Sequence, residues 1–319
     1  MDTPDAPANA ADAAPEPATP AAPEPEPLAA ARATDARPRP LADAPACTWS
    51  GVAGVLTDID DTLTRDGAIE PAALDALHAL AAAGVPVIAV TGRPMGWSQP
   101  FATAWPLRAI VAENGAVMLW RDAGGALQVG YAQDEATRAA NARRLQAAAA
   151  RILAELPDAR LALDSPGRVT DIAIDHAEHA RLDEAAIARV VALMHAQGMH
   201  ATVSSIHVNG WFGEHDKWSG ACWAVRERLA RALPDEVGRW VYVGDSTNDQ
   251  AMFARFGLSV GVANLLDFAD RLHTWPAWIS AGARGAGFAE LAAALLAARA
   301  ALASSPPDSP APSGSGRHR

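Results

Sequence analysis

The sequence predicts an α/β protein with a mainly parallel sheet, helices on both faces of that sheet, and a smaller α+β domain inserted into it. Short apolar runs typical of buried strands alternate with longer patterns typical of helices. The connections between these segments are brief. Strand, helix and strand in close succession favour parallel pairing through crossover connections. Polar residues also follow several apolar runs directly, as expected where a parallel sheet binds a ligand.

The first strand is expected at "GVLTDID", residues 54–60, and a helix is expected at residues 70–84. In the helix pattern, Pro71 stands near the first turn and Gly84 follows the last apolar residue, which are the positions these residues favour. Further strands of the same sheet are expected at residues 85–92, 108–115, 239–245, 258–262 and 277–280.

The inserted α+β domain is expected at residues 117–210. Helices are expected at residues 134–156 and 182–198. Strands paired around two helices are typical of a small α+β domain, so the larger domain would consist of residues 51–116 and 211–303. The strand candidates of the insertion lie at residues 116–120, 127–131, 168–175 and 200–210.

Both ends of the chain predict disordered tails. Residues 1–46 are mainly Ala, Pro, Asp and Glu in near-repeating order, with few large apolar residues to bury. Residues 304–319 have the same character.

Composition excludes several classes of function. The formal net charge of −11 argues against nucleic acid or an anionic membrane as a partner, because either would require a basic face. The chain shows neither a secretory signal pattern nor a long uncharged apolar run, so we expect a soluble cytoplasmic protein. The two cysteines, Cys47 and Cys222, are far apart and lack the spacing of zinc ligands, so no disulfide or zinc site is expected.

Polar residues follow four of the predicted strands, and the carboxyl ends of parallel strands meet at one edge of a sheet. Carboxylates gathered there repel one another, and a hard divalent cation is the ordinary way to hold them together. The sequence therefore predicts a Mg²⁺ site, with Asp58 and Asp245 as direct ligands, a backbone carbonyl at Asp60, and Asp249 or Asn248 acting through water. The four polar segments are residues 57–60, 91–93, 113–115 and 244–249.

Four motifs occur in a characteristic order: "DIDDTLT", "VTGRP", the lysine of "HDKWSG", and "GDSTNDQAM". This order resembles the haloacid dehalogenase superfamily, in particular its phosphatase branch with an α/β cap between the second and third motifs. Phosphatases of sucrose phosphate, trehalose phosphate and mannosylglycerate phosphate belong to that branch. The resemblance covers about residues 51–300 and implies a Rossmann-like catalytic core, a cap domain and dependence on Mg²⁺.

The resemblance also implies roles for individual residues. Asp58 would attack phosphorus and form an aspartyl-phosphate, and Asp60 would act as general acid and then general base. Thr91 would hold a phosphate oxygen with help from the N–H of Gly92. Lys217 would neutralise both Asp58 and the transferring phosphoryl group.

Substrate contacts are expected from both domains. Ser205, His207 and Asn209 alternate along a predicted strand of the insertion and would suit a polyhydroxylated leaving group, although a solvent-facing strand would show the same alternation. Arg93 could contact substrate or pair with a neighbouring acid. The full set of expected substrate contacts is Gly92, Arg93, Asn114, Ser205, His207, Asn209 and Asn248.

These observations together predict a Mg²⁺-dependent phosphatase that acts on a small phosphorylated metabolite, with a sugar phosphate as the expected substrate. A phosphomutase similar to phosphomannomutase is an alternative, because it would form the same aspartyl-phosphate. A phospho-aspartate signalling receiver is an alternative of a different class, but receivers are far shorter and lack the second aspartate of "DID". The sequence does not identify the substrate.

Overall fold

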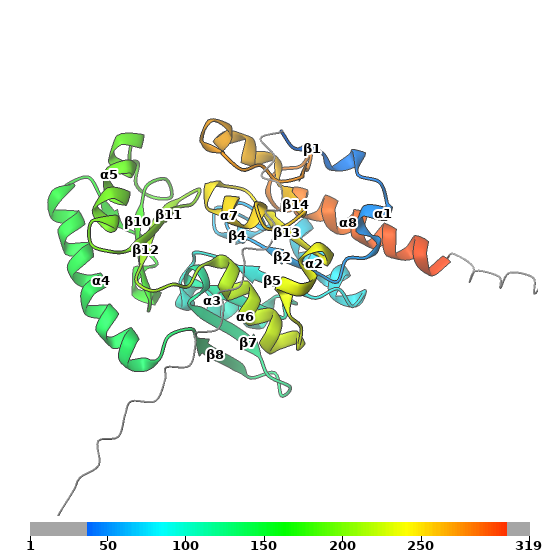
Figure 1. Ribbon diagram of the computed structural model, residues 1–319, viewed down its shortest axis with the longest axis horizontal. Coiled ribbons are helices and arrows are strands. Elements are labelled where there is room, and N and C mark those ends of the chain that lie inside the picture. The colour runs from blue at the N-terminus through cyan, green and yellow to red at the C-terminus, as the bar shows by residue number, and fades with distance from the viewer. Residues whose placement is uncertain (1–36, 305–319) are drawn as a thin grey trace, which may run out of the picture. The chain divides into compact units, whose positions relative to one another are not determined.

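The computed structural model describes residues 37–304, which belong to one compact unit (Figure 1). Its main sheet has nine strands, and β2, Gly54–Thr57, lies at the centre between β13 and β5. The pairings from β1 across to β6 are parallel, as the sequence predicted. The other strands, in order across the sheet, are β1 Arg39–Pro40, β15 Trp278–Ile279, β14 Leu258–Gly261, β13 Trp240–Gly244, then β5 Val87–Val90, β6 Ala109–Ala112, β7 Val117–Arg121 and β8 Leu127–Tyr131.

Both faces of the main sheet are buried, because successive residues of a strand point to opposite faces. Val55 of β2 packs into one apolar cluster with helices α2, Pro71–Ala82, and α8, Arg284–Ser304. The next residue, Leu56, packs into a second cluster with helix α6, Lys217–Leu229. The continuous apolar runs recognised in the sequence follow from this two-sided burial.

The remaining elements are short connections or belong to the insertion. A small hairpin joins β3, Thr64–Arg65, and β4, Ala68–Ile69. The other α-helices are α1 Cys47–Ser50, α3 Met95–Ala104, α4 Glu135–Glu155, α5 Glu184–His195 and α7 Gln250–Phe253. The 3₁₀ turns are η1 Leu41–Asp43, η2 Glu113–Gly115, η3 Ser165–Gly167, η4 Leu233–Arg239, η5 Thr247–Asp249 and η6 Ala263–Arg271.

A second, four-stranded sheet lies in residues 132–211, which we call the inserted segment. Helices α4 and α5 pack against one face of this sheet, as Figure 1 shows in green. The side chains of Asp134 and Asp183 cap these helices by accepting hydrogen bonds from the first-turn N–H groups of Thr137 and Ala186. The strands, in order across the sheet, are β11 His200–Val203, β12 His207–Trp211, β10 Asp171–Asp175 and β9 Arg160–Leu161.

The predicted start of the insertion at residue 117 is too early, because the hairpin of β7 and β8 still belongs to the main sheet. Strands β7 and β8 extend the main sheet as antiparallel strands. The chain reverses after β6 because Glu113, Asn114 and Gly115 have φ values of 49°, 54° and 110°, in the left-handed region. The predicted single strand at residues 200–210 is also a hairpin, in which Ser204 accepts hydrogen bonds from the N–H groups of Ile206 and His207.

The predicted N-terminal tail is too long. Strand β1 pairs with β15 at the edge of the main sheet, and the guanidinium of Arg39 lies 3.8 Å from the ring centre of Trp278. Leu41 is buried. Residues 37–46 therefore belong to the fold, whereas the rest of the predicted tails, residues 1–36 and 305–319, lies outside the described residues.

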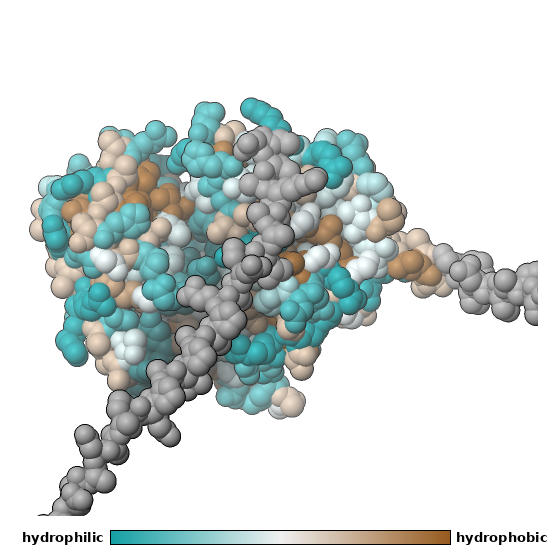
Figure 2. All heavy atoms as spheres, in the orientation of Figure 1, coloured by the Kyte–Doolittle hydropathy of each residue, from teal (hydrophilic) through white to brown (hydrophobic). Residues whose placement is uncertain are grey.

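Helix α8 is long and apolar enough to cross a membrane by length and composition alone. Phe288, Leu291 and Leu295 of this helix are buried in the main apolar cluster. Such burial is ordinary for a core helix, so the composition of α8 gives only weak support for a membrane span. Figure 2 shows hydrophobic residues in small groups among hydrophilic ones on the visible face.

A close approach of two glycines places helix α6 against the carboxyl edge of the sheet. A Cβ at Gly220 of α6 would lie 2.6 Å from the Cα of Gly115, and a Cβ at Gly115 would lie 2.1 Å from the carbonyl oxygen of Asp216. Asp216 caps α6 by accepting a hydrogen bond from the N–H of Ser219. This packing fixes the position of Lys217, the first residue of the helix.

We expect Gly220→Ala to destabilise the fold by about 1–3 kcal/mol, because the added methyl group would meet backbone that cannot easily move. Chemical denaturation would measure the change in the free energy of unfolding. Gly257→Ala is the control, since a Cβ there meets nothing within 4 Å. Equal stability of the two variants would contradict the packing argument.

Candidate active site

Four strands end at one edge of the main sheet, and each delivers polar residues there. Asp58 follows β2, Thr91 follows β5 and Glu113 follows β6. Asp245 follows β13, whose Val243 carbonyl accepts a hydrogen bond from the N–H of Asp58 at 2.9 Å. The predicted gathering of these residues at the carboxyl ends of parallel strands is thus observed in the fold.

Three aspartates form a buried acidic cluster at this edge. Carboxylate oxygens of Asp58, Asp245 and Asp249 lie within 4.8 Å of one another. Burial raises the pKa of Asp58 to about 8, although the charge of Lys217 opposes this shift. Burial and the neighbouring charges of Asp249 and Asp58 raise the pKa of Asp245 well above its ordinary value. If all three carboxylates were ionised, the cluster would therefore carry more negative charge than its surroundings compensate.

Lys217 lies between two of these carboxylates. Its Nζ is 2.7 Å from Oδ1 of Asp58 and 2.7 Å from Oδ1 of Asp249, and its side chain is buried. Burial disfavours the ammonium charge, but Asp249 and Asp58 together raise the pKa of Lys217 above its ordinary value. A permanent cation therefore contacts Asp58 directly.

Asp249 holds this arrangement in place. Its Oδ1 accepts hydrogen bonds from Lys217 and from the hydroxyl of Tyr242 at 2.5 Å, and its Oδ2 accepts from the N–H groups of Asp245 and Ser246. Both carboxylate oxygens are thus occupied by protein donors. We therefore assign Asp249 to positioning Lys217 and the loop after β13.

The acidic cluster fits a divalent cation. Three carboxylates face one ammonium group, and a hard cation with oxygen ligands would supply the missing positive charge. The Oδ1 of Asp245 accepts a hydrogen bond from Thr62 at 3.2 Å, and its Oδ2 lies 3.5 Å from Nδ2 of Asn264. These are long contacts, so the Asp245 carboxylate keeps acceptor capacity for a metal ion.

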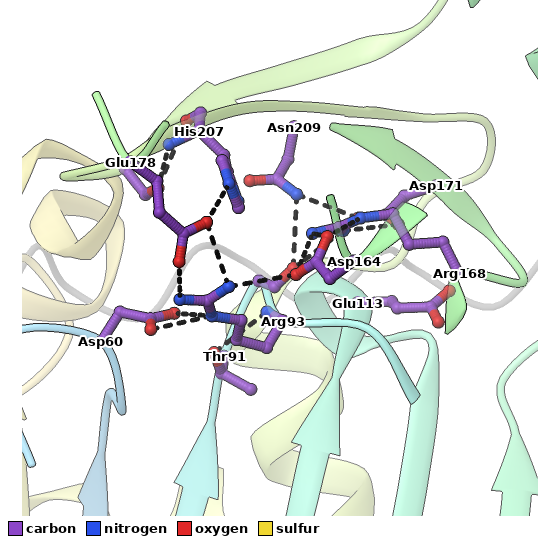
Figure 3. Close-up of polar contacts among 12 residues, drawn as sticks. Asp60, Thr91, Arg93, Glu113, Asp164, Arg168, Asp171, Glu178, His207 and Asn209 are labelled. Atoms are coloured by element: carbon purple, nitrogen blue, oxygen red, sulfur yellow. Dashed lines mark hydrogen bonds and ion pairs between the residues drawn. The ribbon is translucent and has the colours of Figure 1, made fainter. Parts of the chain in front are cut away.

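Arg93 links the carboxyl edge of the main sheet to the inserted segment (Figure 3). Its Nε donates to both carboxylate oxygens of Asp60 at 2.8 and 2.9 Å. Its two terminal nitrogens reach Asp164 at 3.2 Å and Glu178 at 2.8 Å. The guanidinium also lies 4.9 Å from the ring centre of Trp97. Of the two expected roles for Arg93, the structure shows pairing with acids.

A second buried arginine, Arg168, belongs to the same network. It shares Asp164 with Arg93 and pairs with Asp171 at 2.9 Å. It also donates to the backbone carbonyl of Gly92 at 3.0 Å, and Asn209 donates to that same carbonyl at 3.3 Å. The turn after β5 is therefore held from the side of the inserted segment.

Glu113 forms a third link between the sheet and the inserted segment. Its carboxylate accepts hydrogen bonds from the N–H groups of Met95, Val169 and Thr170, and from the Thr170 hydroxyl at 2.5 Å. Burial and the charge of Asp171 raise the pKa of Glu113 to about 7, against the effect of these donors. The inserted segment is thus attached to the edge of the sheet at several points.

A cavity of about 490 Å³ lies between the carboxyl edge of the main sheet and the inserted segment. Asp60 and Asp245 line one side of it, and Arg181 and Ser205 of the inserted segment line it as well. The buried hydroxyl oxygen of Ser205 has no hydrogen-bond partner among residues 37–304. This cavity is large enough for a small metabolite.

The other expected substrate contacts are engaged within the protein. Nε2 of His207 lies 2.9 Å from Oε2 of Glu178, and hydrogen bonds from His207 and Arg93 lower the pKa of Glu178 to about 2 despite its burial. Asn114 donates weakly to Asp171 at 3.5 Å, and Asn248 accepts from the Ser246 hydroxyl. Whether these side chains also meet a substrate stays a prediction.

Several residues of the network were missed by the sequence analysis. Tyr242 lies in an apolar strand, where an aromatic residue predicts core packing. Asp164, Arg168 and Glu178 lie in connections of the inserted segment and belong to none of the four motifs. The only sequence signal for these three residues was the high charge of the connections that carry them. Charged loops are usually exposed to solvent, so this signal did not indicate a buried network.

Comparison with known proteins agrees with this architecture. Residues 55–138 match the family model of haloacid dehalogenase-like hydrolases. The matched range includes Asp58, Asp60 and Thr91. No curated protein matches the chain.

Solved structures share the fold at low sequence identity. Thermoplasma acidophilum 0175 is 18% identical, with a TM-score of 0.56 over 75% of this chain and 96% of its own. The sucrose-phosphatase of Synechocystis is 15% identical, with a TM-score of 0.55 over 76% of this chain and 98% of its own. A phosphatase of the same superfamily from Bacteroides thetaiotaomicron is 18% identical, with a TM-score of 0.52 over 78% and 96% of the two chains. Residues 55–138 are thus similar to haloacid dehalogenase-like hydrolases, and the chain shares its fold with these solved structures.

Proposed function

We propose that the protein is a Mg²⁺-dependent phosphatase that hydrolyses a small phosphorylated metabolite, with a sugar phosphate as the expected substrate. The contact between Lys217 and Asp58, next to Asp245, carries this proposal. An anionic nucleophile can approach an anionic phosphate ester only where positive charge offsets their repulsion. The buried ammonium supplies part of that charge at the carboxylate itself.

In the proposed reaction an oxygen of Asp58 attacks phosphorus, and the bond from phosphorus to the ester oxygen breaks. The leaving oxygen takes a proton from Asp60, and the phosphoryl group remains on Asp58. Asp60 then removes a proton from water, which attacks the same phosphorus and releases inorganic phosphate and free Asp58. Lys217 stabilises the charge on the nucleophile and on the phosphoryl oxygens in both steps.

Asp60 can act as an acid only when it carries a proton. Burial raises its pKa, whereas the charge of Arg93 and the hydrogen bonds from it favour the carboxylate. We infer that substrate binding loosens the contact between Asp60 and Arg93. Thr91 and the backbone of Gly92 lie beside Arg93 and would hold phosphate oxygens, since the Thr91 hydroxyl accepts a hydrogen bond from the N–H of Arg93 at 3.0 Å and can donate its own proton.

Asp58 and Asp245 would hold Mg²⁺ directly, with the carbonyl of Asp60 as an expected third ligand from the protein. Bound Mg²⁺ would polarise the phosphoryl group and offset its charge. Asp249 would support both Lys217 and the loop that carries Asp245.

The inserted segment would act as a cap that excludes water and recognises the leaving group through direct contacts. Its cavity-lining residues, among them Arg181 and Ser205, are the expected contacts of that group. The structural likeness to a sucrose-phosphatase solved in complex with sucrose and phosphate supports a sugar phosphate as substrate. A phosphomutase would instead return the phosphoryl group to bound product, so phosphate release without a bisphosphorylated activator separates the two activities. A cytoplasmic location stays a prediction.

We expect Asp58→Asn to abolish turnover, because a neutral amide cannot form the aspartyl-phosphate. Phosphate release from p-nitrophenyl phosphate would measure this loss. Thermal denaturation serves as the control, since removal of one charge from a crowded acidic cluster should leave the fold intact. Phosphatase activity near that of the parent protein would show that Asp58 is not the nucleophile.

We expect Asp245→Asn to weaken Mg²⁺ binding by at least tenfold, because the variant removes one of two direct carboxylate ligands. Isothermal titration of Mg²⁺ into the full chain measures the affinity without any substrate. The matched control is Asp267→Asn, which neutralises an exposed aspartate of the same cavity. Equal Mg²⁺ affinity of the two variants would show that Asp245 is not a ligand of the metal ion. Activity should also stop on addition of a chelator and return with excess Mg²⁺.

Arg93→Met should destabilise the protein by about 3–5 kcal/mol, because the carboxylates of Asp60, Asp164 and Glu178 would lose a buried cation. Hydrogen exchange at Val169 and Thr170 should also accelerate as the inserted segment loosens. The control is Arg65→Met, which breaks an ion pair on a side chain that is 52% exposed and should cost under about 1 kcal/mol. Similar losses in both variants would mean that the arginine network does not hold the inserted segment.

A further inference from the structure

We propose a second anion-binding site at the opposite edge of the main sheet, for a small ligand with two or more phosphoryl groups. The site is a groove built from two adjoining hollows of about 580 and 480 Å³ that share Leu107, Arg108 and Arg121. Arg231 lines the first hollow and Arg228 lines the second. We call this feature the arginine groove.

The arginine groove is separate from the catalytic cavity. Arg108 immediately precedes β6, and Arg121 ends the antiparallel strand β7. Pro86, which precedes β5, lines the same groove. These positions lie at the amino ends of the parallel strands, whereas the catalytic aspartates follow the carboxyl ends. No residue of the 490 Å³ cavity lines either hollow.

Three arginines of the groove lack acidic partners. Within residues 37–304, the side chains of Arg108 and Arg121 make no hydrogen bond, ion pair or ring contact. Arg228 lies 5.1 Å from the ring centre of Trp120, and its buried Nε has no hydrogen-bond partner. Among the described residues, no carboxylate contact therefore offsets the charge of these three arginines directly, in contrast to Arg93 and Arg168, which are engaged by several carboxylates.

The nearby acids do not cancel this charge. Arg231 is paired with Glu236, which makes that pair neutral. Asp122 lies in the second hollow, but its carboxylate accepts hydrogen bonds from the N–H groups of Gly124 and Ala126 and from the side chain of Gln128. Against three unpaired guanidinium groups, one engaged carboxylate leaves the groove with net positive charge.

The arrangement of the charges indicates the class of ligand. Guanidinium groups bind phosphate oxygens through paired, charge-assisted hydrogen bonds. Arg108 and Arg121 border both hollows, while Arg228 borders only one of them. Cations spread over two joined hollows suit a ligand whose negative charges are also spread, such as a chain of adjacent phosphoryl groups.

Binding of inorganic tripolyphosphate tests the proposal. We expect the full chain carrying Asp58→Asn to bind tripolyphosphate in isothermal titration with EDTA present, and affinity to fall at least tenfold when Arg108→Glu and Arg121→Glu are added. The affinity of the parent should also fall as salt is raised. The matched control carries Arg143→Glu and Arg160→Glu, two exposed arginines of the inserted segment that also lack ion pairs, and should bind within twofold of the parent.

Absence of saturable tripolyphosphate binding would overturn the proposal. So would an equal loss of affinity in the groove and control variants, since this would show a general charge effect. Thermal denaturation of each variant shows that it is folded, and the result does not depend on whether the protein has phosphatase activity.

Discussion

The contact of one buried ammonium with two buried carboxylates is the constraint on which the carboxyl edge of the main sheet depends. Lys217 cannot be moved without leaving Asp58 and Asp249 uncompensated in a site closed to solvent. Several features of the fold serve this contact. Asp216, the residue before Lys217, caps the start of helix α6, and the hydroxyl of Tyr242 donates a hydrogen bond to the Asp249 carboxylate. Even so, three carboxylates face one ammonium group at this edge, which is why we propose a divalent cation there.

The arginine network includes Asp60, the proposed general acid. In the described arrangement Arg93 binds Asp60 on one side and the inserted segment on the other. The same guanidinium therefore links Asp60 to the inserted segment and favours the carboxylate form of Asp60, the proposed general acid. A substrate that draws Arg93 away from Asp60 would raise the pKa of Asp60 and weaken one link to the inserted segment. Proton transfer and movement of the inserted segment would then be coupled through a single side chain.

Much of the fold and the acidic cluster could be predicted because their signals are local. A buried parallel strand is a short apolar run, and the residue after it lies at a known edge of the sheet. The partners of Arg93 could not be predicted in this way. Asp164 and Glu178 are 71 and 85 residues from Arg93, and only the packing of the inserted segment brings them together. Tyr242 was missed because a strand aromatic is ordinarily a core residue.

The turn Glu113–Gly115 explains two features of the structure. It explains why the insertion starts later than the sequence predicted, and it explains the position of Lys217. Its left-handed backbone reverses the chain, so that β7 returns along β6 instead of leaving the sheet. The same turn brings Gly115 against the start of α6 and points the Glu113 carboxylate at the N–H groups of Val169 and Thr170. The sequence shows that Gly115 is a small residue, but it does not show the contacts that the turn makes. One short turn therefore connects the end of the parallel sheet, Lys217 and the inserted segment.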